Sequence, residues 1–328
     1  MQLKTWMVLG RVSNLPTIWT NVLAAMVIAQ TGLLMPGVLL DAEISAAPLW
    51  TNAGMENVGL FLSTLFALSL MYVGGMFLND ASDVQWDRAH GNLRPIVNGD
   101  VSVNTVFLLG SVFLVTAIVI ITYLYQQVLS VSNDATLAYE PYYGFIASVA
   151  LALSVVLYNV MHKKFLYISA FIMGACRLGV YIIAALLLAR LTVLVILAGA
   201  SLLFYIAGLT YLARNEHQEK SNNENNSIAR YWPLLLLLMP VLVSTWVGYS
   251  SVYFWVFLLI FILWIYRWVK PLLWQKNPEV GVCIGGLLAA IPLIDGLMLA
   301  SVQAVVPAMI CLLVFLLMPT LHRWVSGT

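Results

Sequence analysis

Three aspartates, Asp80, Asp83 and Asp87, follow a long apolar run, and Asn79 precedes the first of them. On a helix, residues three and four apart lie on one face, so these carboxylates are about one turn from one another. Like charges so placed repel, and a charge inside a bilayer costs roughly 2.5–3.5 kcal/mol or more. A hard cation would remove the repulsion, and such oxygen ligands suit Mg²⁺, which often binds one or two carboxylates plus substrate phosphates. The spacing therefore predicts a cation and diphosphate site at the mouth of a membrane protein; the alternative is a solvated acidic loop.

Basic residues come after this acidic cluster. Arg88 follows at once, and Arg94-Pro95 with Gly99 lies in the connection to the next apolar segment. A basic side chain close to a bound cation is favourable when an anion lies between them, and a diphosphate is such an anion. The alternative for Arg88 and Arg94 is a role in membrane orientation beside a turn. Arg11, ahead of the first apolar segment, either holds the diphosphate or extends to lipid phosphates.

The composition is that of a polytopic membrane protein. Of the 328 residues, 62% are hydrophobic and 9% are charged, and the mean hydropathy is +0.93, which excludes a soluble globular domain. The net charge of +1 and the lack of a basic tract give no reason to expect nucleic-acid binding. Cys176, Cys283 and Cys311 are scattered through apolar runs and are interpreted as small apolar side chains. The first apolar segment lacks a small-residue cleavage site and is expected to be retained.

Ten apolar segments are long enough to cross a bilayer as helices, near residues 15–34, 57–78, 103–125, 143–161, 166–189, 192–212, 232–249, 252–268, 280–300 and 303–320. Few polar residues separate the last two pairs, so the number falls to eight or nine if those pairs merge. Helices are expected because open sheet edges leave polar groups unsatisfied in hydrocarbon. We therefore predict an all-α transmembrane bundle of nine to ten helices, forming a single integral-membrane domain over residues 1–328.

Basic residues fall almost entirely on one side of this arrangement. With the N-terminus in the cytoplasm, Arg190 alone lies on the outer side and Arg177 lies within a span. This asymmetry follows the positive-inside rule and favours an even number of helices. It predicts a multi-pass protein of the bacterial inner (plasma) membrane whose acidic cluster faces the cytoplasm.

Three polar residues are expected within spans. Arg177 and Asp295 are intramembrane charges, which generally face a bundle interior and pair; a structural pairing is the simplest explanation. Asn21 must find a hydrogen-bond partner, and we expect it to hold helices together. His162 lies in the connection after the fourth segment, where we expect a surface imidazole; a base near an acceptor is the alternative.

The order Asn79, Asp80, Asp83 and Asp87 resembles the first aspartate-rich motif of the UbiA superfamily of intramembrane prenyltransferases, and Arg94-Pro95 with Gly99 extends the resemblance. The resemblance implies a helical bundle around a central cavity, open to the cytoplasm and sideways to lipid. It also implies Mg²⁺-dependent transfer of an isoprenyl group from a prenyl diphosphate donor to an aromatic or other lipophilic acceptor.

The resemblance also implies a role for each matching residue. The residues expected in catalysis are Asp80, Asp83, Asp87, Lys163 and Tyr211. Those expected to bind metal are Asn79, Asp80, Asp83, Asp87, Glu216 and Glu219. Those expected to bind substrate are Arg11, Asn79, Arg94, Tyr158, Lys164 and Arg214. In this scheme Lys163 or Lys164 acts as a point charge on the leaving group, although both are also plausible determinants of orientation.

The second acidic motif departs from the family pattern. Tyr211 matches, but Gly208 and Asn215 stand where aspartates are expected. Glu216 and Glu219 remain, three residues apart, to hold a second cation more weakly. Arg214 is the alternative, since its charge would replace that of one metal ion. This departure brings ionisation by two metals into question.

Two further points are the branch of the superfamily that the sequence resembles and the alternative functions. The run from Tyr211 to Arg214, the run 13–17 and Cys176-Arg177 are similar to the EboC-like branch of the superfamily. The alternative function is a non-catalytic membrane carrier for a lipidic or prenylated metabolite, which the altered second motif favours. An ion-coupled transporter ranks lower because the acidic groups lie at one mouth and not at the membrane midplane.

Overall fold

A computed structural model describes residues 2–31, 33–35, 38–39, 54–91, 94–131, 140–163, 165–188, 190–219, 227–248, 250–274 and 279–325. Within these ranges, residues 2, 33–35, 38–39, 54–57, 131, 166, 214–219 and 227–231 are described by their backbone alone.

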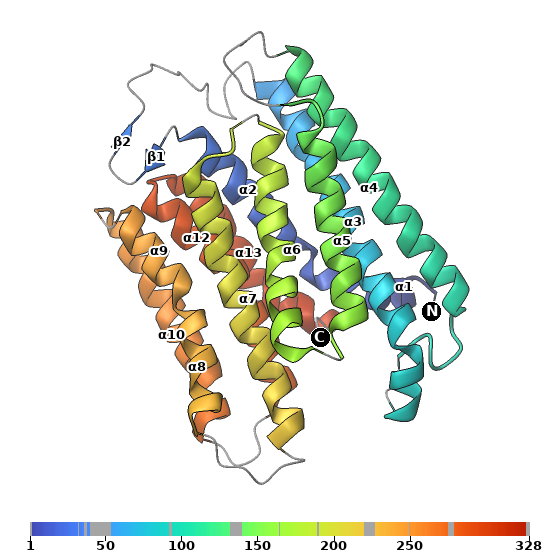
Figure 1. Ribbon diagram of the computed structural model, residues 1–328. Coiled ribbons are helices and arrows are strands. Elements are labelled where there is room, and N and C mark those ends of the chain that lie inside the picture. Colours follow the sequence, from blue (N-terminus) through green and yellow to red (C-terminus); the bar gives the residue numbers. More distant parts are fainter. Residues whose placement is uncertain are drawn as a thin grey trace.

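The chain folds into a helical bundle (Figure 1). The helices of the first half are α1 (Gln2–Leu9), the 3-10 turn η1 (Val12–Asn14), α2 (Leu15–Gln30), α3 (Gly54–Ala89), α4 (Val103–Val131), α5 (Tyr143–Met161) and α6 (Leu166–Leu186). Those of the second half are α7 (Val193–Glu219), α8 (Ser227–Leu237), α9 (Met239–Val247), α10 (Val252–Trp274), α11 (Val280–Leu288), α12 (Ile291–Ser301) and α13 (Val305–Trp324). A short antiparallel hairpin, β1 (Leu33–Met35) with β2 (Val38–Leu39), follows α2. The all-α prediction is confirmed, with this hairpin as a small addition.

The structure also confirms the predicted number of spans. Nine helical segments in the described part of the chain are long and apolar enough to cross a membrane. The predicted segment 232–249 is a shorter apolar stretch, Trp232–Val247, divided between α8 and α9 at Leu238. Pro233 lies inside α8 and Pro240 lies at the start of α9. Because proline lacks an N–H and clashes with the preceding turn, a break here is expected.

The centre of the bundle is formed by α2 and by the pair α11 and α12. The window Val280–Ser301 is 83% buried and Val12–Gln30 is 72% buried, whereas α4, α5, α10 and α13 are mostly exposed toward lipid. Pro292 at the start of α12 explains why the predicted segment 280–300 is two helices. From this position α2 contacts α3, α6, α7, α12 and α13. Polar groups on α2 and α12 are therefore enclosed by protein and shielded from lipid.

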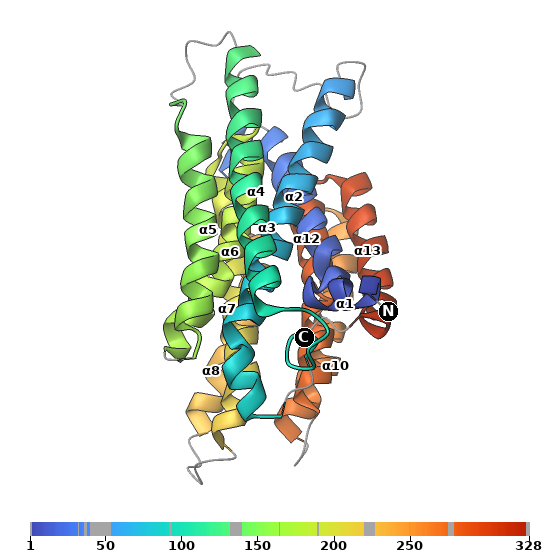
Figure 2. The ribbon, with the colours of Figure 1, turned by 90° about the vertical axis from the view of Figure 1, so that its right-hand side faces the viewer.

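Two helix pairs pack closely along their lengths: α3 packs along α4, and α6 along α7 (Figures 1 and 2). At Gly174 of α6, an added Cβ would collide with the backbone carbonyl of Leu203 on α7. A small residue is needed there because the two backbones approach closely, as is common between membrane helices. The C-terminal turns of α3 and the short helix α1 lie toward the same end of the bundle (Figure 2).

Candidate functional site

The acidic cluster lies on the last turns of α3. This helix runs through the predicted span boundary to Ala89 and ends before Gly91, whose φ of +69° suits a left-handed helix terminus. Because no proline interrupts it, Asp80, Asp83 and Asp87 remain on a regular helix. Their side chains are buried, with exposed fractions of 5%, 7% and 1%. Such burial requires nearby compensating charge, and the alternative of a solvated acidic loop is wrong.

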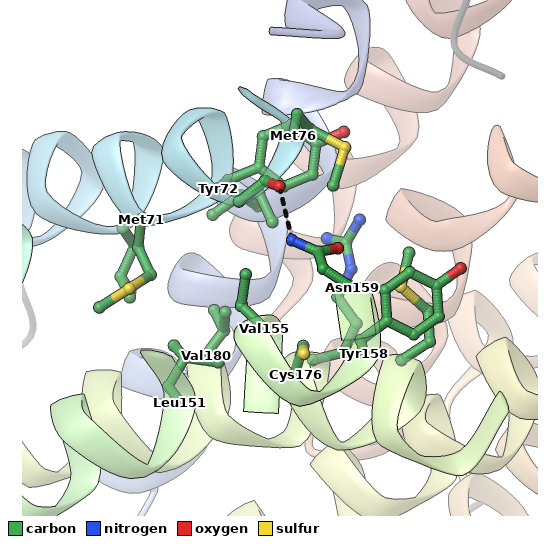
Figure 3. A pocket seen from close by; sticks show the side chains of 14 residues that line it. Met71, Tyr72, Met76, Leu151, Val155, Tyr158, Asn159, Cys176 and Val180 are labelled. Atoms are coloured by element: carbon green, nitrogen blue, oxygen red, sulfur yellow. Dashed lines mark hydrogen bonds between the residues drawn. The ribbon is translucent and has the colours of Figure 1, made fainter. Parts of the chain in front are cut away.

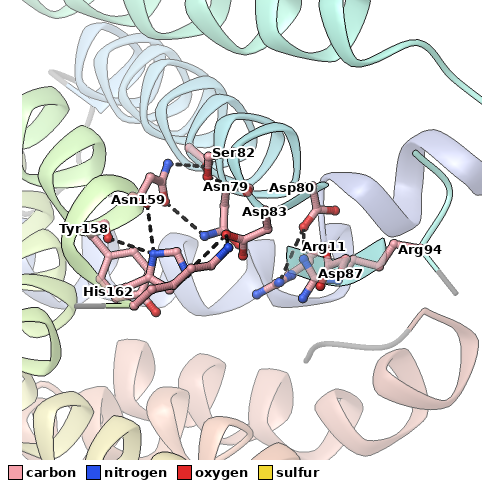
Figure 4. Close-up of polar contacts among 12 residues, drawn as sticks. Arg11, Asn79, Asp80, Ser82, Asp83, Asp87, Arg94, Tyr158, Asn159 and His162 are labelled. Atoms are coloured by element: carbon pink, nitrogen blue, oxygen red, sulfur yellow. Dashed lines mark hydrogen bonds and ion pairs between the residues drawn. The ribbon is translucent and has the colours of Figure 1, made fainter. Parts of the chain in front are cut away.

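Arg94 bridges two of the carboxylates (Figure 4). Its Nη1 donates to Oδ1 of Asp80 at 2.6 Å, and its Nε lies 3.4 Å from Oδ2 of Asp87. The segment after α3 turns back toward the helix, with the amide of Asn98 donating to the carbonyl of Arg94 at 3.0 Å. Planar guanidinium groups bind two oxygens at once, which suits this bridging position.

Arg11, near the N-terminus of the chain, lies close to the carboxylate of Asp80. Its Nη2 lies 3.8 Å from Oδ1 of Asp80. Arg11 has a left-handed backbone conformation, with φ of 42° and ψ of 49°, between α1 and η1. Non-glycine residues rarely adopt this conformation, and its occurrence at a charged site is typical of functional positions.

A second group of basic residues meets Asp83 from the end of α5 (Figure 4). Nζ of Lys163 lies 2.5 Å and Nε2 of His162 lies 3.3 Å from Oδ1 of Asp83. Nδ1 of His162 lies 3.1 Å from the carbonyl oxygen of Tyr158, so both ring nitrogens face oxygen atoms. The expectation of a surface imidazole at His162 is wrong, since its side chain is 12% exposed and held against an aspartate.

Asn159, which sequence reasoning missed, connects this cluster to the interior. Nδ2 of Asn79 donates to Oδ1 of Asn159 at 3.1 Å, and Nδ2 of Asn159 donates to the carbonyl of Gly75 at 3.3 Å. These bonds tie α5 to α3 at the level of the first acidic residue. The sequence signal was present, since Asn159 directly follows Tyr158 and would lie within an apolar span.

An apolar cavity of about 60 Å³ lies on the inner side of Asn159 (Figure 3). Side chains of α2, α3, α5 and α6 line it, among them Met71, Tyr72, Leu151 and Val155. A central cavity was expected, and this cavity lies next to the acidic cluster, to which Asn159 connects it. Its walls include several methionines, which adapt readily to different shapes.

Other predicted residues lie in different surroundings. Tyr158 lines the cavity and stacks on His162, with ring centroids 5.3 Å apart. Tyr211 packs between Tyr167 and Trp232, at 5.0 and 4.6 Å between ring centroids. Among the contacts described, these rings are the partners of Tyr211, and its expected catalytic role stays a prediction.

The remaining predicted site residues have side chains that the structure does not describe. Arg214, Glu216 and Glu219 fall on the last turns of α7, at the same end of the bundle as the acidic cluster (Figure 1). Only their backbone is described, and Lys164 lies outside the described residues. Their expected roles stay predictions.

The donor set of the cluster fits a hard divalent cation. Asn79 and three carboxylates provide oxygen ligands within about two helical turns, and Mg²⁺ prefers such ligands. In the described part of the chain, no three acidic, histidine or cysteine side chains converge closely enough to hold an ion by themselves. Basic residues separate the carboxylates into an Asp80–Asp87 pair and a single Asp83. Contacts from a diphosphate would therefore have to complete the coordination, as is usual for Mg²⁺.

Comparisons with known proteins agree with this geometry. The profile described as the UbiA prenyltransferase family matches residues 44–229, which is more than half of the chain. A solved structure of digeranylgeranylglyceryl phosphate synthase is similar in fold, with a TM-score of 0.58. That similarity covers 94% of this chain and 99% of the other, at 20% identity. No curated protein sequence matches this chain. These findings do not distinguish branches within the family, so the EboC-like placement stays a prediction.

Proposed function

Because this chain belongs to the UbiA prenyltransferase family, we propose that it transfers an isoprenyl group from a prenyl diphosphate to an aromatic or other small lipophilic acceptor within the membrane. The observation that carries the proposal is the meeting of acidic and basic side chains with an apolar cavity beside Asn159. A prenyl diphosphate has the matching halves: a highly charged head and an apolar chain.

The charged residues are proposed to hold the donor head. Asn79, Asp80, Asp83 and Asp87 would hold Mg²⁺, which when bound supplies positive charge to the diphosphate oxygens. Arg11, Arg94 and Lys163 already lie within 4 Å of these carboxylates. Released from the carboxylates, they bind the diphosphate oxygens and stabilise the negative charge that develops on the leaving group.

The cavity is proposed to hold the reacting carbon and the acceptor. The C1–O bond of the donor breaks, the diphosphate leaves with the electron pair, and the allylic cation forms against the apolar wall. Exclusion of water by side chains such as Leu151 and Val155 prevents hydrolysis. The electron-rich acceptor attacks C1, and the proton that it then loses passes to the released diphosphate. No covalent bond to the enzyme is required.

The experiment that tests this function measures diphosphate release by the purified protein in mild detergent. Geranylgeranyl diphosphate is the donor, Mg²⁺ is added or chelated, and a panel of phenols and quinols is offered. Metal-dependent release together with a prenylated product is expected. Tight donor binding without release, over the whole panel, would instead establish the non-catalytic carrier.

Substitution Arg94→Gln is expected to separate metal binding from donor binding. Arg94 neutralises Asp80 and Asp87, so its removal frees two carboxylates and should tighten binding of Mn²⁺ alone about tenfold. The same change removes a cation from the diphosphate site and should weaken donor binding about tenfold. Mn²⁺ affinity by electron paramagnetic resonance and donor affinity by equilibrium dialysis check both directions. A variant that weakens both would show that Arg94 is structural, and Arg267→Gln, exposed on α10, is the control.

We also propose that the acidic end faces the cytoplasm of a bacterial inner membrane, from the distribution of basic residues. A cysteine introduced by Asp100→Cys, exposed beside Arg94, should react with a membrane-impermeant maleimide in inverted vesicles and not in intact spheroplasts. The natural Cys283 and Cys311 are buried, and the partly exposed Cys176 is replaced by Cys176→Ser in the labelling background. Labelling in spheroplasts alone would reverse the orientation.

A further inference from the structure

A buried polar network crosses the centre of the bundle, away from the acidic cluster. Asp295 on α12, Asn21 on α2 and Tyr181 on α6 each have an exposed fraction of 0%. Nδ2 of Asn21 donates to both carboxylate oxygens of Asp295, at 3.0 and 2.8 Å, and the hydroxyl of Tyr181 donates to Oδ1 at 2.5 Å. Because each of these groups donates a hydrogen bond to Asp295, the network suits the ionised carboxylate.

Arg177 joins the network and also reaches the cavity. Its Nη1 donates to Oδ1 of Asn21 at 3.0 Å, and its Cζ lies 5.9 Å from the ring centroid of Tyr72. The residue is 8% exposed and lines the cavity. The hydrogen bond to Asn21 uses one N–H of Nη1. A guanidinium carries five N–H donors, so Arg177 can also donate to an oxygen atom of a ligand in the cavity that it lines.

The charges of this network already balance. Arg177 contributes one positive charge and Asp295 one negative charge, and the neutral amide of Asn21 lies between them. An anionic ligand at Arg177 would therefore leave a net negative charge in a region of low dielectric constant. A neutral oxygen atom can accept a hydrogen bond from the guanidinium without that penalty. The network therefore favours a ligand that accepts a hydrogen bond from Arg177 over an anionic ligand that neutralises its charge.

The position of Arg177 is suited to a small acceptor. Asn159, at the acidic end of the cavity, and Arg177 both line its wall. Tyr72, which packs on Arg177, precedes Asp83 by eleven residues on α3, or about 16 Å along the helix axis. That length accommodates a diphosphate, the reacting carbon and one small ring system. Met71, Met76 and Met173 in the walls can adapt when a ligand widens the cavity.

We propose that Arg177 binds the acceptor through a neutral hydroxyl or carbonyl oxygen, and that the acceptor is accordingly an uncharged phenol or quinol. This inference rests on the proposed prenyl transfer for its meaning and deepens it by naming the acceptor class. Arg177 orients the far side of the acceptor ring, so that the near side faces C1 of the donor. Acceptors that carry a carboxylate or a phosphate are disfavoured.

The test compares 2-naphthol with 2-naphthoate, which share a ring system and differ in the charge of the oxygen group. Equilibrium dialysis against the purified full-length protein should show 2-naphthol binding about tenfold more tightly. Arg177→Lys should remove about tenfold of the 2-naphthol affinity, because the fork of donors is lost while the charge remains. Arg190→Lys, outside the cavity lining, is the matched control and should bind like the wild type. Tighter binding of 2-naphthoate, or unchanged binding by Arg177→Lys, would overturn the inference.

Two further measurements keep the result decisive. If Arg177→Lys does not fold, judged by its thermal unfolding midpoint, the comparison of the two probes on the wild type still decides the charge preference. Diphosphate release is measured separately. Probe binding through Arg177 without any diphosphate release would refute the proposed transfer and leave this site standing. Diphosphate release and prenyl transfer by Arg177 variants that bind 2-naphthol normally would support the proposed transfer and refute acceptor binding at Arg177.

Discussion

Substitution Asp83→Ala is expected to reduce metal-dependent release of diphosphate by about 100-fold or more. Asp83 is the central carboxylate of the cluster, and it is the one that holds Lys163 and His162 in place. Its loss removes a ligand for Mg²⁺ and also releases two basic groups from the position where the donor head is proposed to bind. Both effects act on the same step, so the loss should exceed that of either neighbour alone. The measurement is the initial rate of diphosphate release at saturating donor and Mg²⁺.

Folding should not explain that loss. Asp83 lies at the end of α3, and its partners belong to the turn after α5, so the bundle centre is untouched. The thermal unfolding midpoint should stay close to that of the wild type. Asp100→Asn, which changes an exposed carboxylate in the connection after α3, is the matched control and should release diphosphate normally. Wild-type rates in Asp83→Ala would remove the basis of the proposed function.

The acidic cluster illustrates what helical spacing can and cannot predict. Spacing of three and four residues correctly placed Asp80, Asp83 and Asp87 along the end of one helix. It could not show which basic residue meets which carboxylate, because Arg11 and Lys163 are brought in by other helices. The sequence therefore predicted the charges at the site, and the packing of α1, α3 and α5 determined how they are divided.

Contacts across long sequence separations were the least predictable part. Arg177 and Asp295 were expected to pair, and the structure joins them through Asn21, whose predicted role in holding helices together is confirmed. The bridging position of Asn21 depends on α2 lying between α6 and α12, which no local pattern reveals. In contrast, the prolines on either side of Leu238 are a local signal from which the helix break there can be predicted.

Substitution Asp295→Ala is expected to lower the free energy of unfolding by about 3–5 kcal/mol. The change removes the acceptor of hydrogen bonds from Asn21 and Tyr181, and it leaves the buried Arg177 without a counter-charge. Reversible unfolding in mixed micelles, followed by tryptophan fluorescence against the fraction of sodium dodecyl sulfate, measures the effect. Ser301→Ala on the same helix is the control, because the Ser301 hydroxyl donates to the carbonyl of Met298 within the same helix and to no other described residue. This change should cost about 1 kcal/mol or less.

The double substitution Arg177→Met with Asp295→Leu shows whether charge imbalance or lost packing causes the instability of Asp295→Ala. If the unpaired cation causes the instability of Asp295→Ala, removing both charges should recover most of the lost free energy, since apolar replacements of buried ion pairs are often neutral or stabilising. If lost packing is the cause, the double variant stays as unstable as the single one. A stable double variant that binds 2-naphthol poorly would also show why the network persists in the membrane. That result would mean that the fold does not need Arg177 whereas acceptor binding does, and that Asp295 makes a cation tolerable beside the cavity.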